Sequence, residues 1–299
     1  MLRVRVGIVI LTEDRWWSGE PKWRHAEELG FDHAWTYDHL AWRNLADGPW
    51  FSAIPTLTAA AMVTSTIKLG TMVAAPSYRH PVPFMRELIT LDDISDGRLI
   101  AGLGAGVDSG GLRDRDTIGE PERSKADMAT QYAEFVEVLD GLLTTDKFDY
   151  RGKYYTVNAA RNRPGSVQHP RVPFALAANG PRSLALAARF GQGWITTGKG
   201  GDDQESWWRG VATLSEQFTE ALAAAGREPD AAARLLMLDS GPTSALSSVE
   251  TFTEAARRAS KLGFTDIVVH WPRAEEPYAG SEAVLERVAD VALAEVKQL

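Results

Sequence analysis

The stretch FDHAWTYDHL, residues 31–40, places an apolar run directly before the polar pair Asp38 and His39. A helical pattern that ends in glycine precedes this run, and the same arrangement returns before the apolar runs at residues 194–196 and 266–269. Glycine readily takes the left-handed conformation that ends many helices, so a short strand can follow it. The sequence therefore predicts a repeated helix-then-strand unit. It places Asp38 and His39 at the carboxyl end of a strand, where α/β folds bind ligands.

Eight short runs rich in apolar or β-branched residues are the predicted strands. They lie at residues 4–11, 33–36, 67–73, 98–103, 172–177, 193–196, 234–239 and 266–270. Between them, apolar residues recur every three or four positions, as from Phe84 to Leu91 and from Met128 to Leu142, which one buried helix face requires. Strands that alternate with helices pair in parallel. We therefore predict an α/β fold, a (β/α)8 TIM barrel, with residues 1–299 in a single domain.

Residues 144–173 interrupt the alternation because they carry no helical period. Within them, residues 148–155 alternate and turn at Arg151 and Gly152, which predicts a small hairpin. We interpret this segment as an insertion between the fourth helix and the fifth strand that covers the site.

Composition limits the partners. The chain of 299 residues has 40 acidic and 32 basic residues and a net charge of -8, so a nucleic-acid partner is not expected. It has no cysteine, which excludes disulfides, thiolate metal sites and a cysteine nucleophile. No apolar run is long enough to span a membrane. The familiar metal-hydrolase and serine-hydrolase motifs are also missing, so we expect no metal. We expect a cytoplasmic protein that acts on a small molecule.

A histidine and several tryptophans near the predicted strand ends are candidates for an active site. Histidine titrates near neutrality, so His39 is a candidate for proton transfer, with Asp38 orienting it or contacting a ligand. A polar pair that satisfies loop backbone groups explains the same residues. The chain has ten tryptophans, and four of them follow the first two strands: Trp16, Trp17, Trp42 and Trp50. They either wall an aromatic pocket or pack under loops or at a dimer interface.

Glycines mark two further candidate segments. Residues 104–106 read Gly-Ala-Gly after the fourth strand, which permits close approach of a flat ring or a phosphate but also suits an ordinary turn. Val107 stands where a dinucleotide-binding fingerprint needs its last glycine, so that fold is not predicted. Residues 179–183 read Asn-Gly-Pro-Arg-Ser, a helix start in which Asn179 or Gly180 caps. Such a start binds phosphate or is simply a capped helix.

Four ordered motifs carry a family resemblance. They are residues 26–32 with 38–40, residues 69–73 with 79–81, residues 95–98 with 102–106, and residues 178–180 with 187–194. On these motifs the chain resembles the bacterial-luciferase-like superfamily, and especially its coenzyme F420-dependent oxidoreductases, over nearly its full length. The resemblance implies a barrel that holds a deazaflavin or a flavin at the carboxyl ends of its strands. An FMN-dependent monooxygenase is the alternative within the superfamily.

The resemblance also implies roles for particular residues. The bond between Met72 and Val73 would be a non-prolyl cis peptide behind the cofactor ring. His39 would be the catalytic residue. The implied cofactor-binding residues are Asp38, Met72, Val73, Ala75, Ala105, Gly106, Asn179, Gly180, Arg182 and Ser183.

Residues 194–199 further resemble F420-dependent glucose-6-phosphate dehydrogenases, which implies substrate contacts at Thr197 and Lys199, with Trp42 above the substrate. Val107 replaces the glutamate of that group and Lys199 lies one residue nearer the strand, so only the cofactor is carried over. Asp108 is a candidate to replace the missing acid, although its side chain would need a different approach. A homodimer is expected on resemblance, supported by apolar helices at residues 51–63 and 84–94. A cofactor-binding protein without turnover and a glycosidase using Asp108 and Asp239 are the other hypotheses.

Overall fold

The computed structural model describes residues 4–42, 45–106 and 114–299, and eight of its strands close into a barrel. Around the barrel their order is β1-β10-β9-β8-β7-β4-β3-β2, which confirms the predicted TIM-barrel fold. The strands are β1 (Arg5–Val9), β2 (His33–Thr36), β3 (Lys68–Thr71), β4 (Leu99–Leu103), β7 (Phe174–Ala177), β8 (Gly193–Thr196), β9 (Ala233–Met237) and β10 (Asp266–His270). Each predicted run overlaps one of them. The runs at residues 4–11, 67–73 and 234–239 were predicted too long at their carboxyl ends.

Helices follow the strands as the apolar spacing predicts. They are α1 (Trp16–Glu28), α2 (Ala53–Val63), α3 (Pro81–Ile94), α4 (Asp114–Thr117), α5 (Lys125–Thr144), α6 (Pro181–Phe190), α7 (Gln204–Ala224), α8 (Val249–Lys261), α9 (Glu282–Val291) and α10 (Leu293–Val296). Phe84, Leu88 and Leu91 of α3 are buried, as are Tyr132 and Phe135 of α5. Within the described part of the chain, no helix combines the length and the apolar character that crossing a membrane requires.

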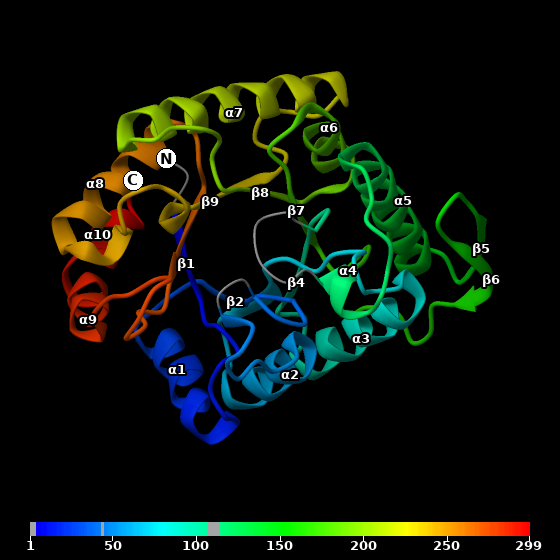
Figure 1. Ribbon diagram of the computed structural model, residues 1–299, viewed down its shortest axis with the longest axis horizontal. Helices are drawn as coiled ribbons and strands as arrows, with labels where there is room; N and C mark the ends of the chain where they lie inside the picture. The colour runs from blue at the N-terminus through cyan, green and yellow to red at the C-terminus, as the bar shows by residue number, and fades with distance from the viewer. Residues whose placement is uncertain (1–3, 43–44, 107–113) are drawn as a thin grey trace. The chain divides into compact units, whose positions relative to one another are not determined.

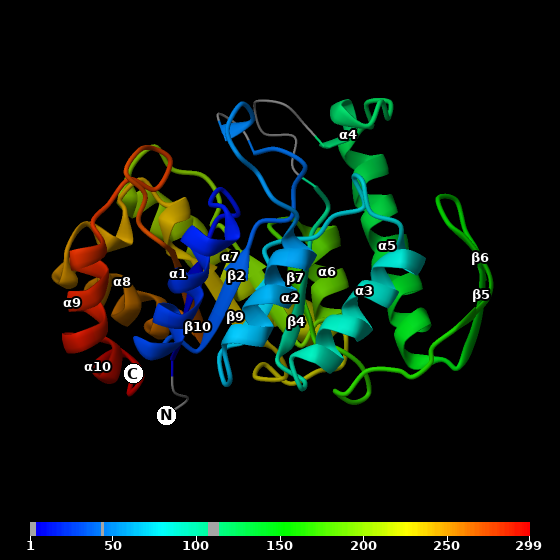
Figure 2. The same ribbon diagram turned by 90° about the horizontal axis from the view of Figure 1, so that it is seen from below.

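The chain divides into two compact units, and the first comprises the chain up to Ile10, residues 24–35 and residues 178–299. In it, β1 pairs in parallel with β2 and β10, and β9 pairs in parallel with β8 and β10. Helix α7 packs along α6, and α8, α9 and α10 pack together (Figures 1 and 2).

A buried polar network joins the amino-terminal ends of β1, β2 and β10. Asp266 accepts hydrogen bonds from Nε and Nη2 of Arg5, both at 2.7 Å, and its Oδ1 lies 3.0 Å from Nε2 of His33. Trp35 Nε1 donates to Nδ1 of His33 at 2.6 Å. A Cβ at Gly7 would lie 1.9 Å from that same Nδ1, so glycine makes room for the ring. Burial by itself raises the pKa of Asp266, but the hydrogen bonds from Arg5 and His33 outweigh it and hold the pKa at about 2.

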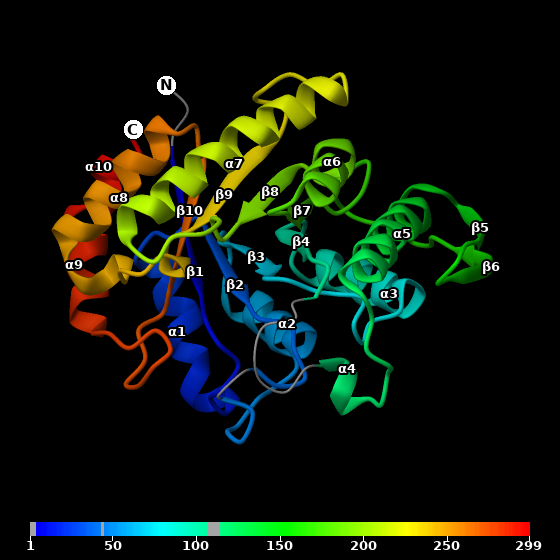
Figure 3. The same cartoon turned by 45° about the horizontal axis from the view of Figure 1, so that its top comes forward.

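The second unit comprises residues 11–23 and 36–177 and contains β3, β4, β7 and a hairpin of β5 (Lys147–Arg151) and β6 (Thr156–Arg161). The hairpin lies beside α5 (Figure 3). It occupies the predicted insertion, but the prediction that its second arm is complete by residue 155 was wrong. The backbone N–H groups of Lys153, Tyr154 and Tyr155 all donate to the carboxylate of Glu134 on α5. These bonds hold residues 153–155 in the turn, so the second strand begins only at Thr156.

Candidate functional site

His39, just after β2, is paired with an aspartate that the sequence analysis did not single out. Its Nδ1 lies 2.8 Å from Oδ2 of Asp114 on α4, and the other oxygen of Asp114 accepts the backbone N–H of Leu40 at 2.7 Å. Figure 2 shows α4 and the loop after β2 at the same end of the second unit. The side chains of His39 and Asp114 are 14% and 5% exposed. The pair is thus largely buried, but the His39 side chain keeps some access to solvent.

Aromatic side chains surround the His39 ring. Trp42 lies against it, with ring centroids 4.6 Å apart and planes inclined by 32°, and Tyr37 packs edge-on against Trp42 at 4.9 Å. Trp50 Nε1 donates to the carbonyl oxygen of His39 at 2.8 Å. Trp17, by contrast, is 86% exposed. Of the four tryptophans singled out in the sequence, Trp42 and Trp50 contact His39, together with Tyr37, whereas Trp17 is exposed.

Asp38 is buried, and protein donors occupy both oxygens of its carboxylate. Tyr78 Oη donates to Oδ1 at 2.5 Å, Arg79 Nη2 donates to the same oxygen at 2.8 Å, and Arg79 Nε donates to Oδ2. A further nitrogen of Arg79 donates to Glu87 at 2.6 Å. Burial raises the pKa of Tyr78 and the charge of Asp38 adds to the rise, so the phenol remains a donor. The carboxylate of Asp38 therefore holds Tyr78 and Arg79 in place.

The segments after β3 and β4 lie close to each other, near the pair of His39 and Asp114. The peptide bond between Met72 and Val73 is cis, which confirms the prediction. A Cβ at Gly104 would lie 2.3 Å from Cγ2 of Val73, so the glycine admits the valine side chain. Gly106 has a φ of +79°, and a Cβ there would lie 3.6 to 3.7 Å from Ser77 and Ala75.

Ser77 connects these strand ends to the histidine pair. Its hydroxyl lies 3.4 Å from Oδ2 of Asp114, which in turn holds His39. Gly106 and Ala75, which lie beside Ser77, are therefore close to the pair of His39 and Asp114. Val107 and Asp108 lie outside the described residues.

The remaining predicted cofactor residues lie in the first unit, at the start of α6. Asn179 accepts from Oγ1 of Thr196 at 2.6 Å and donates to Oγ1 of Thr197 at 2.7 Å. Gly180 is the N-cap, and Ser183 Oγ accepts the N–H of Gly180 at 3.3 Å and donates to its carbonyl at 3.0 Å. The hydroxyl of Ser183 thus closes the cap. Arg182, Thr197 and Lys199 are exposed.

Two arginines that the sequence analysis missed lie near the start of α5 in the second unit. Arg115 is buried, and its Nη2 donates to Gln131 at 2.6 Å, but its Nε is buried without a hydrogen-bond partner among the described residues. The Nε of Arg123 is in the same state. Burial lowers the pKa of Arg115, and the charge of Arg123 lowers it further. Two close guanidinium groups with unused donors fit an anionic oxygen. The run of acidic and basic residues around Arg115 was the one signal available in the sequence.

Asp239, which follows β9, is held by hydrogen bonds from His270 and from the backbone of Ala245. Oδ2 of Asp239 accepts the backbone N–H of His270 at 2.7 Å and lies 3.0 Å from Nδ1 of that histidine, while Oδ1 accepts the N–H of Ala245 at 2.9 Å. His270 also stacks on Tyr278, with ring centroids 3.5 Å apart. These bonds leave Asp239 poorly placed to act as a glycosidase acid or nucleophile, so that hypothesis loses one of its two carboxylates.

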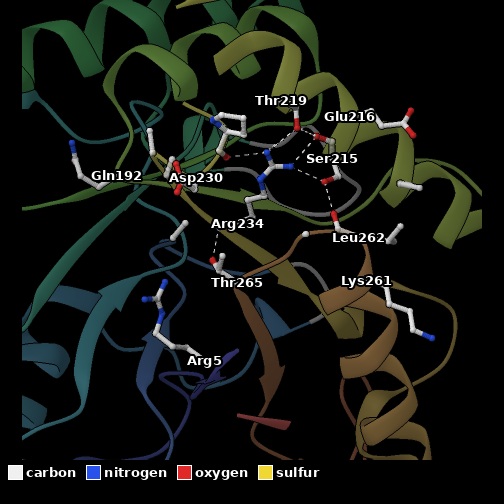
Figure 4. A pocket seen from close by; sticks show the side chains of 16 residues that line it. Arg5, Gln192, Ser215, Glu216, Thr219, Asp230, Arg234, Lys261, Leu262 and Thr265 are labelled. Atoms are coloured by element: carbon white, nitrogen blue, oxygen red, sulfur yellow. Dashed lines mark hydrogen bonds between the residues drawn. The ribbon is translucent and has the colours of Figure 1, made fainter. Parts of the chain in front are cut away.

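A cavity of about 790 Å³ lies elsewhere in the first unit, by the amino-terminal ends of β1, β9 and β10 (Figure 4). Its buried cation, Arg234, donates to Oγ of Ser215 at 2.8 Å, to Oγ1 of Thr219 at 2.8 Å and to the carbonyl of Pro229 at 3.2 Å. Figure 4 shows the guanidinium turned toward these acceptors. In TIM barrels this end serves stability, whereas catalysis occupies the opposite end. The cavity is therefore not the candidate site.

Comparison with known proteins identifies the family. Residues 22–240 match the profile of the luciferase-like monooxygenase family. The chain belongs to this family. Among relatives, this luciferase-like protein is 33% identical over 212 residues to 5,10-methylenetetrahydromethanopterin reductase from Methanopyrus kandleri, covering 69% of the chain and 58% of the reductase. It is 30% identical over 284 residues to F420-dependent glucose-6-phosphate dehydrogenase from Kineococcus radiotolerans, covering 87% of the chain and 80% of the dehydrogenase.

Solved structures agree on the fold of this luciferase-like protein. The coenzyme F420 dependent tetrahydromethanopterin reductase from Methanopyrus kandleri superimposes with a TM-score of 0.76 at 22% identity, covering 98% of this chain and 99% of that one. The long-chain alkane monooxygenase LadA gives a TM-score of 0.76 at 12% identity, covering 100% of this chain and 92% of that one. Both structures therefore share the barrel fold of this chain.

Proposed function

We propose that the chain is an F420-dependent oxidoreductase that transfers hydride between coenzyme F420 and a small organic substrate, with His39 exchanging the accompanying proton. The choice of cofactor rests on one observation, the 30% identity to an F420-dependent glucose-6-phosphate dehydrogenase along 80% of that relative. The role of His39 is supported by its position after β2, shielded by Trp42 and close to the segments that follow β3 and β4.

The residues of the second unit fit such a cofactor. Gly106 carries no side chain and its positive φ disfavours one, while Ala75 beside it is small, so this part of the wall stays flat enough for a ring. Met72, Val73 and Ala105 would complete the wall. When bound, F420 supplies the carbon that accepts or donates hydride. Asp38 would meet the ring through its backbone, because its carboxylate is held by Arg79 and Tyr78.

Two places suit the anionic part of the cofactor. Asn179, Gly180, Arg182 and Ser183 remain the prediction from the resemblance, while the unused Nε donors of Arg115 and Arg123 support a second place. Arg182→Ala and Arg115→Gln, each titrated with F420, separate the two. Loss of a charge-assisted contact weakens binding by about 1.5 to 3 kcal/mol. We expect that loss at whichever arginine contacts the anion, and an unchanged affinity in both variants would exclude both places.

His39 would exchange a proton with an oxygen of the substrate. In the oxidative direction, the imidazole would accept the hydroxyl proton of a substrate alcohol as the alcohol carbon gives up hydride to bound F420, so that a carbonyl forms. In the reverse direction, His39 would return the proton to the oxygen of the reduced carbonyl. Trp42 covers one face of the imidazole and would exclude water there. We propose Trp42, Thr197 and Lys199 as substrate contacts.

Cofactor titration is the test of this function. Purified protein is mixed with F420 and, separately, with FMN, and binding is followed by absorbance and fluorescence. We expect saturable binding of F420 and turnover of alcohols with oxidised F420 or of carbonyls with reduced F420, without oxygen consumption. Preferential binding of FMN with oxygen uptake by the reduced complex would instead indicate the monooxygenase branch. Binding of F420 with no turnover across the substrate panel would indicate a cofactor-binding protein.

We also propose that the protein forms a homodimer through α2 and α3, where Met62 is 72% exposed and Phe51 and Ile94 are partly exposed. Exposed apolar side chains on neighbouring helices favour self-association. Light scattering at micromolar concentration should give about twice the 32.7 kDa mass of the chain. A particle of single-chain mass would contradict the proposal.

A further inference from the structure

We propose that Asp114 is the positioning residue of His39, which fixes its tautomer so that Nε2 is the atom that exchanges the proton. This inference rests on the proposed function for its catalytic consequence, but the tautomer itself is a property of the unliganded protein. Among the described residues, the side chain of Asp114 forms hydrogen bonds with His39, Leu40 and Ser77, none of them a predicted cofactor residue, so it would act through the histidine.

The donors around Asp114 determine the tautomer. An ionised carboxylate only accepts hydrogen bonds. Its Oδ1 accepts the backbone N–H of Leu40 at 2.7 Å, and its Oδ2 faces Nδ1 of His39 at 2.8 Å. Nδ1 must therefore carry the proton, and the lone pair of the neutral ring lies on Nε2. Within the described ranges, no hydrogen bond is made to Nε2 of His39.

The contacts around His39 also oppose rotation of its ring. Trp50 Nε1 holds the carbonyl of His39, and Asp114 holds the next backbone N–H, that of Leu40. Trp42 packs on the ring itself. Turning the ring over would remove the 2.8 Å contact with a carboxylate that is only 5% exposed and has little access to water as a substitute partner. One orientation and one tautomer are therefore favoured together.

A second histidine provides an internal reference. Nδ1 of His33 accepts the N–H of Trp35, so His33 must carry its proton on Nε2, which faces Asp266. The two histidines are thus expected to show opposite tautomers in one sample. The chain has six histidines, few enough to resolve their ring nitrogens in a long-range proton–nitrogen NMR spectrum.

The decisive variant is Asp114→Asn, examined by NMR without any cofactor. In the part of the chain that the structure describes, Asp114 serves three donors: the N–H of Leu40, Nδ1 of His39 and, at 3.4 Å, the hydroxyl of Ser77. An amide has one acceptor oxygen, and where that oxygen stays with Leu40 the amide NH2 faces Nδ1 of His39 and can only donate to it. We expect the Nδ1–H tautomer of His39 to be lost in this variant, with the signal assigned by its absence in His39→Gln. Asp116→Asn removes the same charge from the exposed face of α4 and should leave the spectrum unchanged. A His39 protonated on Nε2 in the natural protein would overturn the inference.

Kinetics provide the second readout. With F420 saturating, kcat should fall roughly 10²-fold in Asp114→Asn, the lower end of what a positioned acid–base group contributes, while KM stays within about threefold. Asp114→Glu keeps the carboxylate and should recover part of the loss. An unchanged kcat with intact F420 turnover would overturn the role of Asp114 alone. Failure of the natural protein to bind F420 would overturn the proposed function but would leave the tautomer result unchanged. If Asp114→Asn does not fold, the NMR spectrum of the natural protein still decides which nitrogen of His39 carries the proton.

Discussion

Two histidines flank the same strand, β2, and each faces an aspartate, yet their surroundings differ in kind. His33 opens the strand with both ring nitrogens used, one toward Trp35 and one toward Asp266. His39 follows the strand with one nitrogen held by Asp114 and no hydrogen bond made to the other by the described residues. Both nitrogens of His33 are bonded to protein groups, which suits a structural role, whereas the second nitrogen of His39 is open to exchange a proton with a ligand.

The aspartates differ in the same sense. Asp266 serves Arg5, His33 and Thr265 at once, and its pKa of about 2 keeps it ionised at any physiological pH. It joins the beginnings of β1, β2 and β10. Asp114 serves His39, the neighbouring backbone of Leu40 and, at 3.4 Å, the hydroxyl of Ser77. We therefore expect changes at the His33 end of β2 to lower stability, and changes at the His39 end to lower turnover.

The largest effect is expected for His39→Ala. Turnover with saturating F420 should fall roughly 10²- to 10⁴-fold, since the group that exchanges the proton is removed. Affinity for F420 should stay within about threefold, and the unfolding free energy should change little. Steady-state kinetics and cofactor titration on the same sample measure both quantities. Intact turnover with weakened F420 binding would make His39 a cofactor contact instead.

The next effect is expected for Asp266→Ala, which leaves His33 and Arg5 without their acceptor. Removing one partner from a largely buried charged network costs about 2 to 4 kcal/mol of unfolding free energy, less than a fully buried pair because the side chain of Arg5 is 46% exposed. Urea unfolding measures it, with the exposed Asp47→Ala as the matched control. A loss of kcat per folded molecule would show that the two ends of β2 are not separate in function.

The pH dependence of unfolding tests the structural role of Asp266 further. Folding lowers the pKa of Asp266 from 3.8 to about 2, so its charge stabilises the fold above pH 3.8 and this contribution is lost as the pH falls through about 2. The shift corresponds to about 2 kcal/mol. The stability advantage of the natural protein over Asp266→Asn should shrink by that amount between about pH 5 and pH 2. Parallel curves for the two proteins would show that the carboxylate contributes no pH dependence.

A smaller effect is expected for Gly7→Ala. The added Cβ would lie 1.9 Å from Nδ1 of His33, so the ring must shift and lengthen its hydrogen bond with Trp35. Overpacking of this kind costs about 1 to 3 kcal/mol, and we expect the lower half of that range. Thermal unfolding measures it. Gly48→Ala, whose Cβ would meet only an ordinary contact at 3.4 Å, is the control and should lie near the natural protein.

The sequence was sufficient for the strands whose apolar runs stop abruptly. Residues 33–36, 193–196 and 266–270 were predicted with the observed bounds, because each follows a helical pattern that ends in glycine. The helices followed from one buried face in each, as in α3 and α5. The second strand of the hairpin was misplaced because the backbone bonds to Glu134 join positions about 20 residues apart, which no local pattern indicates.

The site was only partly predictable for the same reason. His39 and the glycines of residues 104–106 are recognisable because their position at strand ends is local information. Asp114 is separated from His39 by 75 residues, so its role depends on how the segment after β4 folds back. Arg79 similarly bonds to Asp38 across 41 residues, a partner that no local pattern indicates.

One spectrum tests the central contrast most directly. A long-range proton–nitrogen NMR spectrum of the unliganded natural protein reports which ring nitrogen of each histidine carries the proton, and it requires neither cofactor nor substrate. We predict that His33 is protonated on Nε2, where it faces Asp266, and that His39 is protonated on Nδ1, where it faces Asp114. The same tautomer at both positions, or a rapidly exchanging mixture at His39, would contradict the account.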